Sequence, residues 1–369
     1  MTKPRKERVQ GEAQRLLSAG VTGGVFPGAS ACIAWSENGQ HVFATATAGK
    51  LFPSGPSVTD ATTYDLASLT KPFVAVEALK LVADDKLELD MRADSLVSDV
   101  RGTHGGSQTV ESLFTHTSGL APWGGLYLDV PHDRGTSAAR RWILSEAARR
   151  AEERKPETDL YSDLGYMIAG EVVARAAGVS LDRALRRDLL DPLGIADSVF
   201  YAGALPPEKR QAFIENTAPT ERCEWRGQIV RGEVHDENCA ALGGVSGHAG
   251  LFGTAAGVAR FAMEILDVLA GRSTFLPKAA LEQAIAERPG FRYRFGWDGR
   301  AKEGSASGRQ MGPRTFGHLG FTGTSVWCDP DRDVAVILLT NRVHPSRANE
   351  KIKGFRPAFH DGVIAAFDS

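Results

Sequence analysis

The sequence predicts an α/β (α+β) fold, in which both ends of the chain form an antiparallel sheet flanked by helices and a mostly helical domain is inserted between them. Three observations predict it: strand patterns near the N-terminus, strand patterns again in the last third, and helices with long loops between them up to about residue 240. We therefore expect a discontinuous α/β domain at residues 1–66 and 245–369, and a helical domain at residues 67–244.

Composition is that of a soluble globular protein, with 42% hydrophobic and 24% charged residues among 369. The formal net charge of −2 gives no reason to expect nucleic acid or an anionic membrane as a partner. The basic N-terminus is followed by no apolar segment of secretory length, so we expect a cytoplasmic protein. Four scattered cysteines without a CxxC pair favour buried free thiols over a disulfide framework or a zinc site.

The N-terminal elements follow from simple periodicities. Residues 6–19 have the apolar spacing of an amphipathic helix, and Gly20 follows its end. The segment GASACIAWSENGQHVFATATAG then predicts two strands joined by an Asn38-Gly39 hairpin turn. A further helix is expected over residues 68–84.

The second half changes from helices back to strands. RRWILSEAARRAEERK predicts a helix with a charged, solvated face, and TAAGVARFAMEILDVLAG predicts a second, amphipathic one. Four strand candidates follow: FRYRFGWD, TFGHLGF, TSVWCDP and DVAVILLTN. The last two are joined by the short turn at residues 330–332, which is typical of a hairpin.

The stretch ASLTKPF places Ser68 and Lys71 three residues apart at the start of a helix. A lysine there opposes the helix dipole, and such local violations often mark functional sites. Residues i and i+3 share a helix face with Cβ atoms about 5–6 Å apart, so the Lys71 amine can reach the Ser68 hydroxyl. If burial lowers the pKa of Lys71, the amine can activate the serine as a nucleophile. The alternative is a chance match to a short motif.

A second motif, DLYSDLGYMIAG, places Tyr161 just before a predicted helix. Ser162 or Asp163 can cap that helix. Tyr161 is expected to be exposed at the junction, where a neighbouring ammonium group would make its phenol easier to ionise. It could then serve as a general base and acid.

A third motif, TFGHLGFTGTS, predicts a strand with Phe316, His318, Gly320 and Thr322 on one side. Gly320 and Gly323 weaken a strand interior, which indicates a close approach to the backbone, and a ligand lying along that edge would fit. The alternative is a lone strand histidine beside ordinary turn glycines.

Other serine and metal signatures are weaker. GGVSGHAG resembles a nucleophile elbow, but His248 stands where the last glycine is required, so Ser246 is interpreted as a turn residue. His116 in FTHTSGL could be a catalytic base, although a buried loop-fixing histidine is favoured. HDEN at 235–238 has no second histidine at metal-ligand spacing and is interpreted as a structural loop.

In this order and spacing, the motifs resemble the serine β-lactamase-like superfamily, which includes class C β-lactamases, D-alanyl-D-alanine carboxypeptidases and family VIII-type carboxylesterases. The similarity runs from about residue 25 to about residue 345 and includes SLTK, FTHTSGL, YSD, HDEN, GHAGLFGTAAGVARFA and GHLGFTGTS. It implies an active site between the two domains and an acyl-enzyme reaction that needs no metal or cofactor.

The resemblance also implies residue roles. Ser68 is the nucleophile, Lys71 helps to deprotonate it, and Tyr161 passes the proton to the leaving group. The oxyanion hole is expected at the N–H groups of Ser68 and Phe321, beside Gly320. Asp163 stands where the family usually has asparagine, and His318 replaces the usual lysine or arginine.

These two departures weaken recognition of an anionic substrate. We therefore expect a serine hydrolase acting on small-molecule esters or uncharged amides, foremost a carboxylesterase with possible weak β-lactam hydrolysis. A β-lactamase or D-amino-acid peptidase remains an alternative within the enzyme class. A non-hydrolytic penicillin-binding or scaffold protein is the alternative outside it. No sequence pattern indicates the oligomeric state.

Overall fold

A six-stranded antiparallel sheet, built from both ends of the chain, forms the core of the computed structural model, which describes residues 3–151 and 159–369. The strand order is β2-β1-β11-β10-β9-β8, and every neighbouring pair is antiparallel. The bounds are β1 Gly28–Glu37, β2 Gln40–Gly49, β8 Asp298–Gly299, β9 Phe316–Leu319, β10 Ser325–Asp329 and β11 Val334–Thr340. The predicted fold class is confirmed; the division at residues 66/67 and 244/245 stays a prediction.

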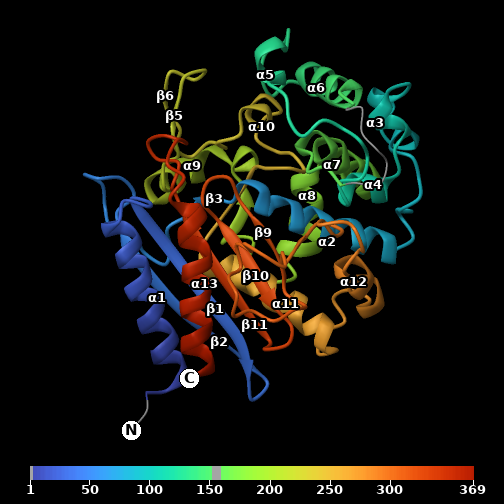
Figure 1. The fold of residues 1–369 in the computed structure, drawn as a ribbon. Helices are drawn as coiled ribbons and strands as arrows, with labels where there is room; N and C mark the ends of the chain where they lie inside the picture. Colours follow the sequence, from blue (N-terminus) through green and yellow to red (C-terminus); the bar gives the residue numbers. More distant parts are fainter. Residues whose placement is uncertain (1–2, 152–158) are drawn as a thin grey trace.

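The central strand β11 is buried along its whole length because helices cover both faces of the sheet. Figure 1 shows α1 (Arg5–Thr22) and α13 (Ile352–Asp368) side by side on one face, with α11 (Ala255–Ala270) behind the strands. A strand covered on both faces needs an almost continuous apolar run, and VAVILLT supplies one. The β1–β2 turn is confirmed too: Asn38 and Gly39 both have positive φ, as a type I′ hairpin requires.

The remaining elements make up the helical part and two small sheets. The helices are α2 Thr70–Ala83, α3 His104–Ser107, α4 Val110–Phe114, α5 Leu126–Asp129, α6 Ser137–Arg149, α7 Asp163–Ala177, α8 Leu181–Leu185, α9 Pro207–Asn216, α10 Glu237–Ala241 and α12 Lys278–Ile285. The short strands are β3 Tyr64–Asp65, β4 Val199–Tyr201 and β7 Leu251–Gly253, which pair in the order β3-β7-β4, and the hairpin β5 Arg222–Cys223 with β6 Gln228–Ile229. A 3₁₀ turn, η1 (Ala67–Leu69), leads from β3 into α2.

Two elements differ from the sequence-based expectation. The predicted strand FRYRFGWD is mostly loop, because the Asp159 carboxylate accepts the backbone N–H groups of Arg292 and Tyr293 and a strand ladder cannot use them. Helix α13 was not predicted at all, yet it completes the layer beside α1. The charged helix predicted from RRWILSEAARRAEERK ends at Arg149, and residues 152–155 of that segment lie outside the described residues.

All four cysteines are buried free thiols, as predicted. Across the described ranges, no single helix has the length and apolarity to cross a membrane. One pair, Asp163–Ala177 with Leu181–Leu190, passes that test together but is bent by 67°.

Candidate active site

Ser68 lies in a tight turn that the preceding residues hold in an uncommon conformation. Ala67 has a φ of +48°, a region that residues with a Cβ rarely adopt. The buried Asp65 carboxylate accepts the Ala67 N–H at 2.8 Å and the His235 N–H at 2.6 Å, which clamps the turn from two sides. Ser68 is thereby presented at the entrance to α2.

Lys71, one turn further along, is completely buried and contacts three oxygen atoms. Its Nζ lies 2.9 Å from Ser68 Oγ, 2.7 Å from Asp163 Oδ1 and 3.1 Å from the His248 carbonyl oxygen. A neutral amine has two N–H donors and one lone pair. As an ammonium group, Lys71 donates to all three oxygen atoms; once it loses a proton, Asp163 and His248 can accept the two remaining hydrogens and leave the lone pair for the Ser68 hydroxyl. Burial lowers the pKa of Lys71, although the Asp163 carboxylate opposes the shift.

Tyr161 approaches the same pair from the start of α7, but its environment differs from the prediction. The residue is half-buried rather than exposed, and its ring packs against His116 at 4.6 Å and Tyr293 at 5.4 Å. The Lys71 Nζ lies 4.8 Å from the ring centroid. Burial, and then the charge of Asp163, raise the pKa of Tyr161 well above its ordinary value, against a hydrogen bond with Ser68. The expectation of an easily ionised phenol was therefore wrong, because burial and the Asp163 carboxylate both favour the neutral phenol.

The two residues beside Tyr161 have structural partners. Ser162 caps α7 by accepting the Gly165 N–H at 3.0 Å. The Ser162 N–H donates to His116 Nδ1 at 3.0 Å, and burial holds the pKa of His116 well below its ordinary value. His116 therefore fixes the loop as a neutral acceptor, the favoured of its two interpretations.

The third motif forms the opposite wall on β9. His318 is buried, donates from Nδ1 to the Leu319 carbonyl at 2.9 Å, and lies 6.1 Å from the Tyr161 ring. Burial, and then the charge of Lys71, lower the pKa of His318 to about 3. The histidine is therefore neutral across the physiological range.

The turn between β9 and β10 is fastened to the segment that carries Ser68. Thr322 Oγ1 donates to the Asp65 carbonyl at 2.7 Å, and Thr324 Oγ1 donates to the Leu66 carbonyl at 3.0 Å. A Cβ at Gly320 would collide with the Leu66 carbonyl and the Thr324 side chain. The protein itself therefore makes a close approach to this glycine, as predicted, while binding of a ligand along the edge stays a prediction.

Two backbone N–H groups remain as candidates for an oxyanion hole. Among the described residues, neither the Ser68 nor the Phe321 N–H donates to a protein acceptor. The Phe321 carbonyl is held by Arg342 Nε and Nη2 at 2.9 and 2.7 Å, which fixes the peptide on that side. Phe321 itself is an exposed residue, with 49% of its surface accessible. The oxyanion role of the two groups stays a prediction.

The HDEN segment has structural contacts, but only His235 and Asp236 precede the helix, since Glu237 and Asn238 begin α10. Asp236 caps α10 by accepting the Cys239 N–H. The Asn238 side chain accepts the Tyr127 N–H and donates to the Gly124 carbonyl. Within the part of the chain that the structure describes, no group of three or more His, Cys, Asp or Glu side chains could hold a metal ion.

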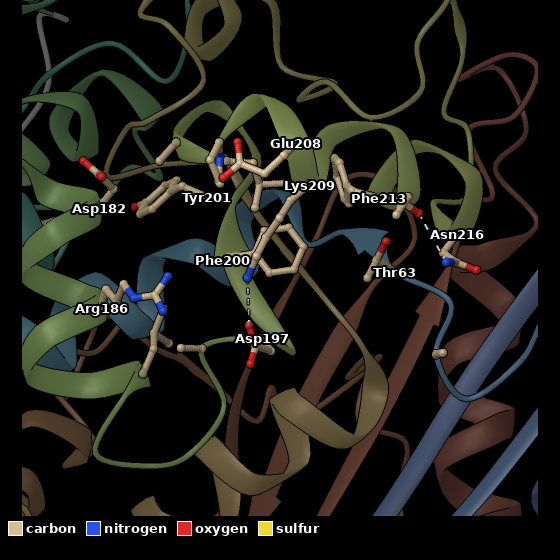
Figure 2. Close-up of a pocket in the computed structure, with 17 residues that line it drawn as sticks. Thr63, Asp182, Arg186, Asp197, Phe200, Tyr201, Glu208, Lys209, Phe213 and Asn216 are labelled. Atoms are coloured by element: carbon tan, nitrogen blue, oxygen red, sulfur yellow. Dashed lines mark hydrogen bonds and ion pairs between the residues drawn. The ribbon is translucent and has the colours of Figure 1, made fainter.

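A separate cavity of about 470 Å³ lies among β4, α8 and α9 (Figure 2). Its walls include the rings of Phe200, Tyr201 and Phe213 together with the charged side chains of Arg186 and Lys209. None of its lining residues is a predicted catalytic residue. Tyr201 of this cavity donates from its hydroxyl to the Ser246 carbonyl, two residues before His248, at 2.9 Å.

The sequence motifs identify the central residues but not their supports. The structure brings together Ser68, Lys71, Tyr161, Asp163 and His318, and it places Gly320 and Phe321 beside them. Asp65, Tyr293, Arg342 and the His248 carbonyl were missed. Of these, only Asp65 could have been predicted from the sequence. An aspartate at the start of a turn often accepts the backbone N–H of the residue two positions later.

Comparisons with known proteins identify the family of this chain. A family model described as Beta-lactamase matches residues 13–355. A relative from Escherichia coli (strain K12), named "Putative D-alanyl-D-alanine carboxypeptidase", is 28% identical over 316 residues, which cover 78% of this chain and 70% of that protein.

Solved structures share the fold. EstCE1, described as a hydrolase with promiscuous acyltransferase activity, matches with a TM-score of 0.72 and 18% identity over 96% of this chain and 99% of its own. A class C β-lactamase from Rhodobacter sphaeroides matches with a TM-score of 0.68 and 17% identity over 97% and 99%. At such identities the likeness concerns the fold alone.

Proposed function

Because the chain belongs to the β-lactamase family and is a hydrolase of the serine β-lactamase fold, we propose that it is a carboxylesterase that acts through an acyl-enzyme on Ser68. One observation carries the choice of substrate: the position that would hold a substrate carboxylate is a neutral His318. A carboxylate gains most from a permanent cation at that position.

The arginines that lie against the rings of the site are already engaged. Arg342 donates to three backbone carbonyls, among them that of Phe321. Arg347 is paired with Glu221 and Glu237, and Arg292 with Asp298. A substrate anion would have to displace these partners, which supports an uncharged substrate.

The contacts support a definite sequence of proton transfers. The neutral Lys71 amine takes the Ser68 proton as Oγ attacks the ester carbonyl, and the developing oxyanion accepts from the Ser68 and Phe321 N–H groups. The Tyr161 phenol, kept protonated by its raised pKa, donates its proton to the departing alkoxide. The Lys71 ammonium reprotonates Tyr161, and water then cleaves the acyl-enzyme by the same route.

The alternative with separate support is a D-amino-acid carboxypeptidase, because the curated relatives at 27–28% identity carry that name. Such a peptide ends in a carboxylate, so the neutral His318 counts against it. A non-hydrolytic scaffold is the remaining alternative, and the short Lys71–Ser68 contact counts against that one.

The test compares hydrolysis of p-nitrophenyl acetate, nitrocefin and a D-alanyl-D-alanine peptide by the wild type and by Ser68→Ala. We expect ester turnover that the substitution abolishes, with slow or undetectable turnover of the two anionic substrates. Faster turnover of nitrocefin or of the peptide would replace the esterase assignment. Undiminished activity of Ser68→Ala would refute the nucleophile.

A further inference from the structure

A chain of three polar side chains, the partly buried Asp236 and the buried His248 and Ser246, lies beside Lys71 and has no role in the mechanism above. His248 Nε2 is 2.8 Å from Asp236 Oδ1, and His248 Nδ1 is 2.9 Å from Ser246 Oγ. Because an ionised carboxylate can only accept, Nε2 carries a proton, and Nδ1 shares a hydrogen bond with the Ser246 hydroxyl.

This Asp-His-Ser arrangement is not a second catalytic triad. In the catalytic arrangement the serine contacts Nε2 and the aspartate contacts Nδ1, whereas here the two are exchanged. Ser246 and His248 are only 2% and 1% exposed, so no substrate carbonyl reaches the hydroxyl. The group must act through what it holds in place.

What it holds is the loop whose carbonyl contacts the catalytic amine. The His248 carbonyl lies 3.1 Å from Lys71 Nζ. Tyr201, seen on the wall of the cavity in Figure 2, donates to the Ser246 carbonyl, and Gly247 packs so closely on Gly170 of α7 that a Cβ there would collide with it. These contacts fix the loop on several sides. The His248 ring fixes it further, through its hydrogen bonds to Asp236 and Ser246.

We propose that His248, held between Asp236 and Ser246, is a positioning residue for Lys71. By fixing its own carbonyl on one N–H of the amine, it directs the lone pair of the amine at Ser68. The role rests on the proposed function in requiring that Lys71 activate Ser68, although not on which ester is cleaved.

The charge of Asp236 connects this group of residues to Lys71 in a second way, through the pKa of the amine. Despite burial, the charge and hydrogen bond of His248 hold the pKa of Asp236 well below its ordinary value, so the carboxylate is ionised. That negative charge raises the pKa of Lys71. The groups that face Lys71 are Ser68, His116, Tyr161, Asp163, Tyr166, Asp236, Cys239, His248 and His318.

The experiment measures the rate at which a fluorophosphonate labels Ser68 between pH 5 and 9, because this readout assumes no particular substrate. The variants are His248→Gln, Ser246→Ala and Asp236→Asn. His360→Gln, a buried histidine on α13 outside the site, is the matched control. Thermal unfolding of each variant shows whether it is folded, and Ser246→Ala serves where a larger change prevents folding.

We expect labelling to slow about tenfold or more in His248→Gln and several-fold in Ser246→Ala, since small misplacements of a catalytic group are costly. In Asp236→Asn the acid limb should move to lower pH by about half a unit, because Lys71 loses a neighbouring anion. His360→Gln should keep the wild-type rate and profile.

Folded His248→Gln and Ser246→Ala proteins that label at the wild-type rate and with the wild-type profile would overturn the inference. Labelling that responds as expected in a protein that hydrolyses no ester would sustain the inference while refuting the esterase assignment. Wild-type protein that is not labelled at Ser68 at all would overturn both.

Discussion

At the scale of the residue, the site works by desolvation more than by charge. Lys71, Tyr161 and His318 are each shifted toward their neutral form mainly by burial. Burial thus keeps the acid Tyr161 and the wall residue His318 neutral, and it favours the unprotonated form of the base Lys71. Asp163 is the carboxylate that contacts the Lys71 amine directly. Its charge raises the pKa of Lys71 and so opposes the effect of burial.

Asp163→Asn should move the acid limb of the kcat/KM profile for p-nitrophenyl acetate to lower pH, by about one unit. The carboxylate raises the pKa of Lys71, so its removal leaves more of the amine unprotonated in mild acid. The amide oxygen can still accept a Lys71 hydrogen, which preserves the geometry. The measurement is a full pH–rate profile of the wild type and of Asp163→Asn. If the acid limb of the profile does not move, a group other than Lys71 is the titrating base.

His318→Lys should improve nitrocefin hydrolysis about tenfold, because a hydrogen bond to a charged group contributes about 1.5–3 kcal/mol and 1.36 kcal/mol is tenfold. Hydrolysis of p-nitrophenyl acetate, which carries no carboxylate, should gain nothing. His318→Gln is the neutral control and should leave nitrocefin turnover low. Equal gains for both substrates in His318→Lys would contradict the proposed carboxylate discrimination.

At the scale of the element, α2 carries the chemistry and also a buried acid. Glu77 is fully buried on α2, and within the described chain neither of its carboxylate oxygens accepts a hydrogen bond. In its protonated form the carboxyl group can share a hydrogen bond with Asp188. Burial, together with the neighbouring Asp188, raises the pKa of Glu77 to about 8. The helix is therefore most stable when this carboxyl group is protonated.

Glu77→Gln should make stability less dependent on pH. The folded pKa lies above the ordinary value of 4.5, so the protonated carboxyl stabilises the wild type fully below about pH 4.5. That stabilisation is lost as pH rises toward and through about 8. The free energy of unfolding, measured with urea at pH 5 and at pH 8.5, should rise for Glu77→Gln relative to the wild type at the higher pH. Glu282→Gln, at an exposed position, should show no such gain.

How much could be predicted differed between elements for physical reasons. The hairpin β1–β2 and strand β11 were predictable because turn chemistry and apolar runs are local signals. The segment FRYRFGWD was misassigned because its N–H groups are taken by Asp159, more than 130 residues away in the chain. The Ser68–Lys71 spacing was likewise local, whereas the ionisation of Tyr161 depended on burial that only the folded chain supplies.

At the scale of the whole molecule, the last helix reaches the catalytic turn. Helix α13 lies on the sheet beside α1, far along the chain from Ser68. Its buried Arg356 donates from Nη2 to the carbonyls of Gly320 and Thr324, both at 2.7 Å. These carbonyls flank Phe321, so α13 supports the turn that presents the second N–H of the proposed oxyanion hole.

Arg356→Gln should therefore impair catalysis beyond its effect on stability. Two buried carbonyls lose a charged donor, at a cost of about 1–3 kcal/mol each in the free energy of unfolding. The loosened turn should also lower kcat for p-nitrophenyl acetate about tenfold or more, as loss of an oxyanion donor does elsewhere. Phe359→Ala, on the same helix but in the apolar layer, should cost about 3–5 kcal/mol of stability. It leaves the turn intact, so its kcat should stay near that of the wild type while it remains folded. If the two variants lose kcat equally at matched folded fractions, α13 contributes stability alone and the turn does not depend on Arg356.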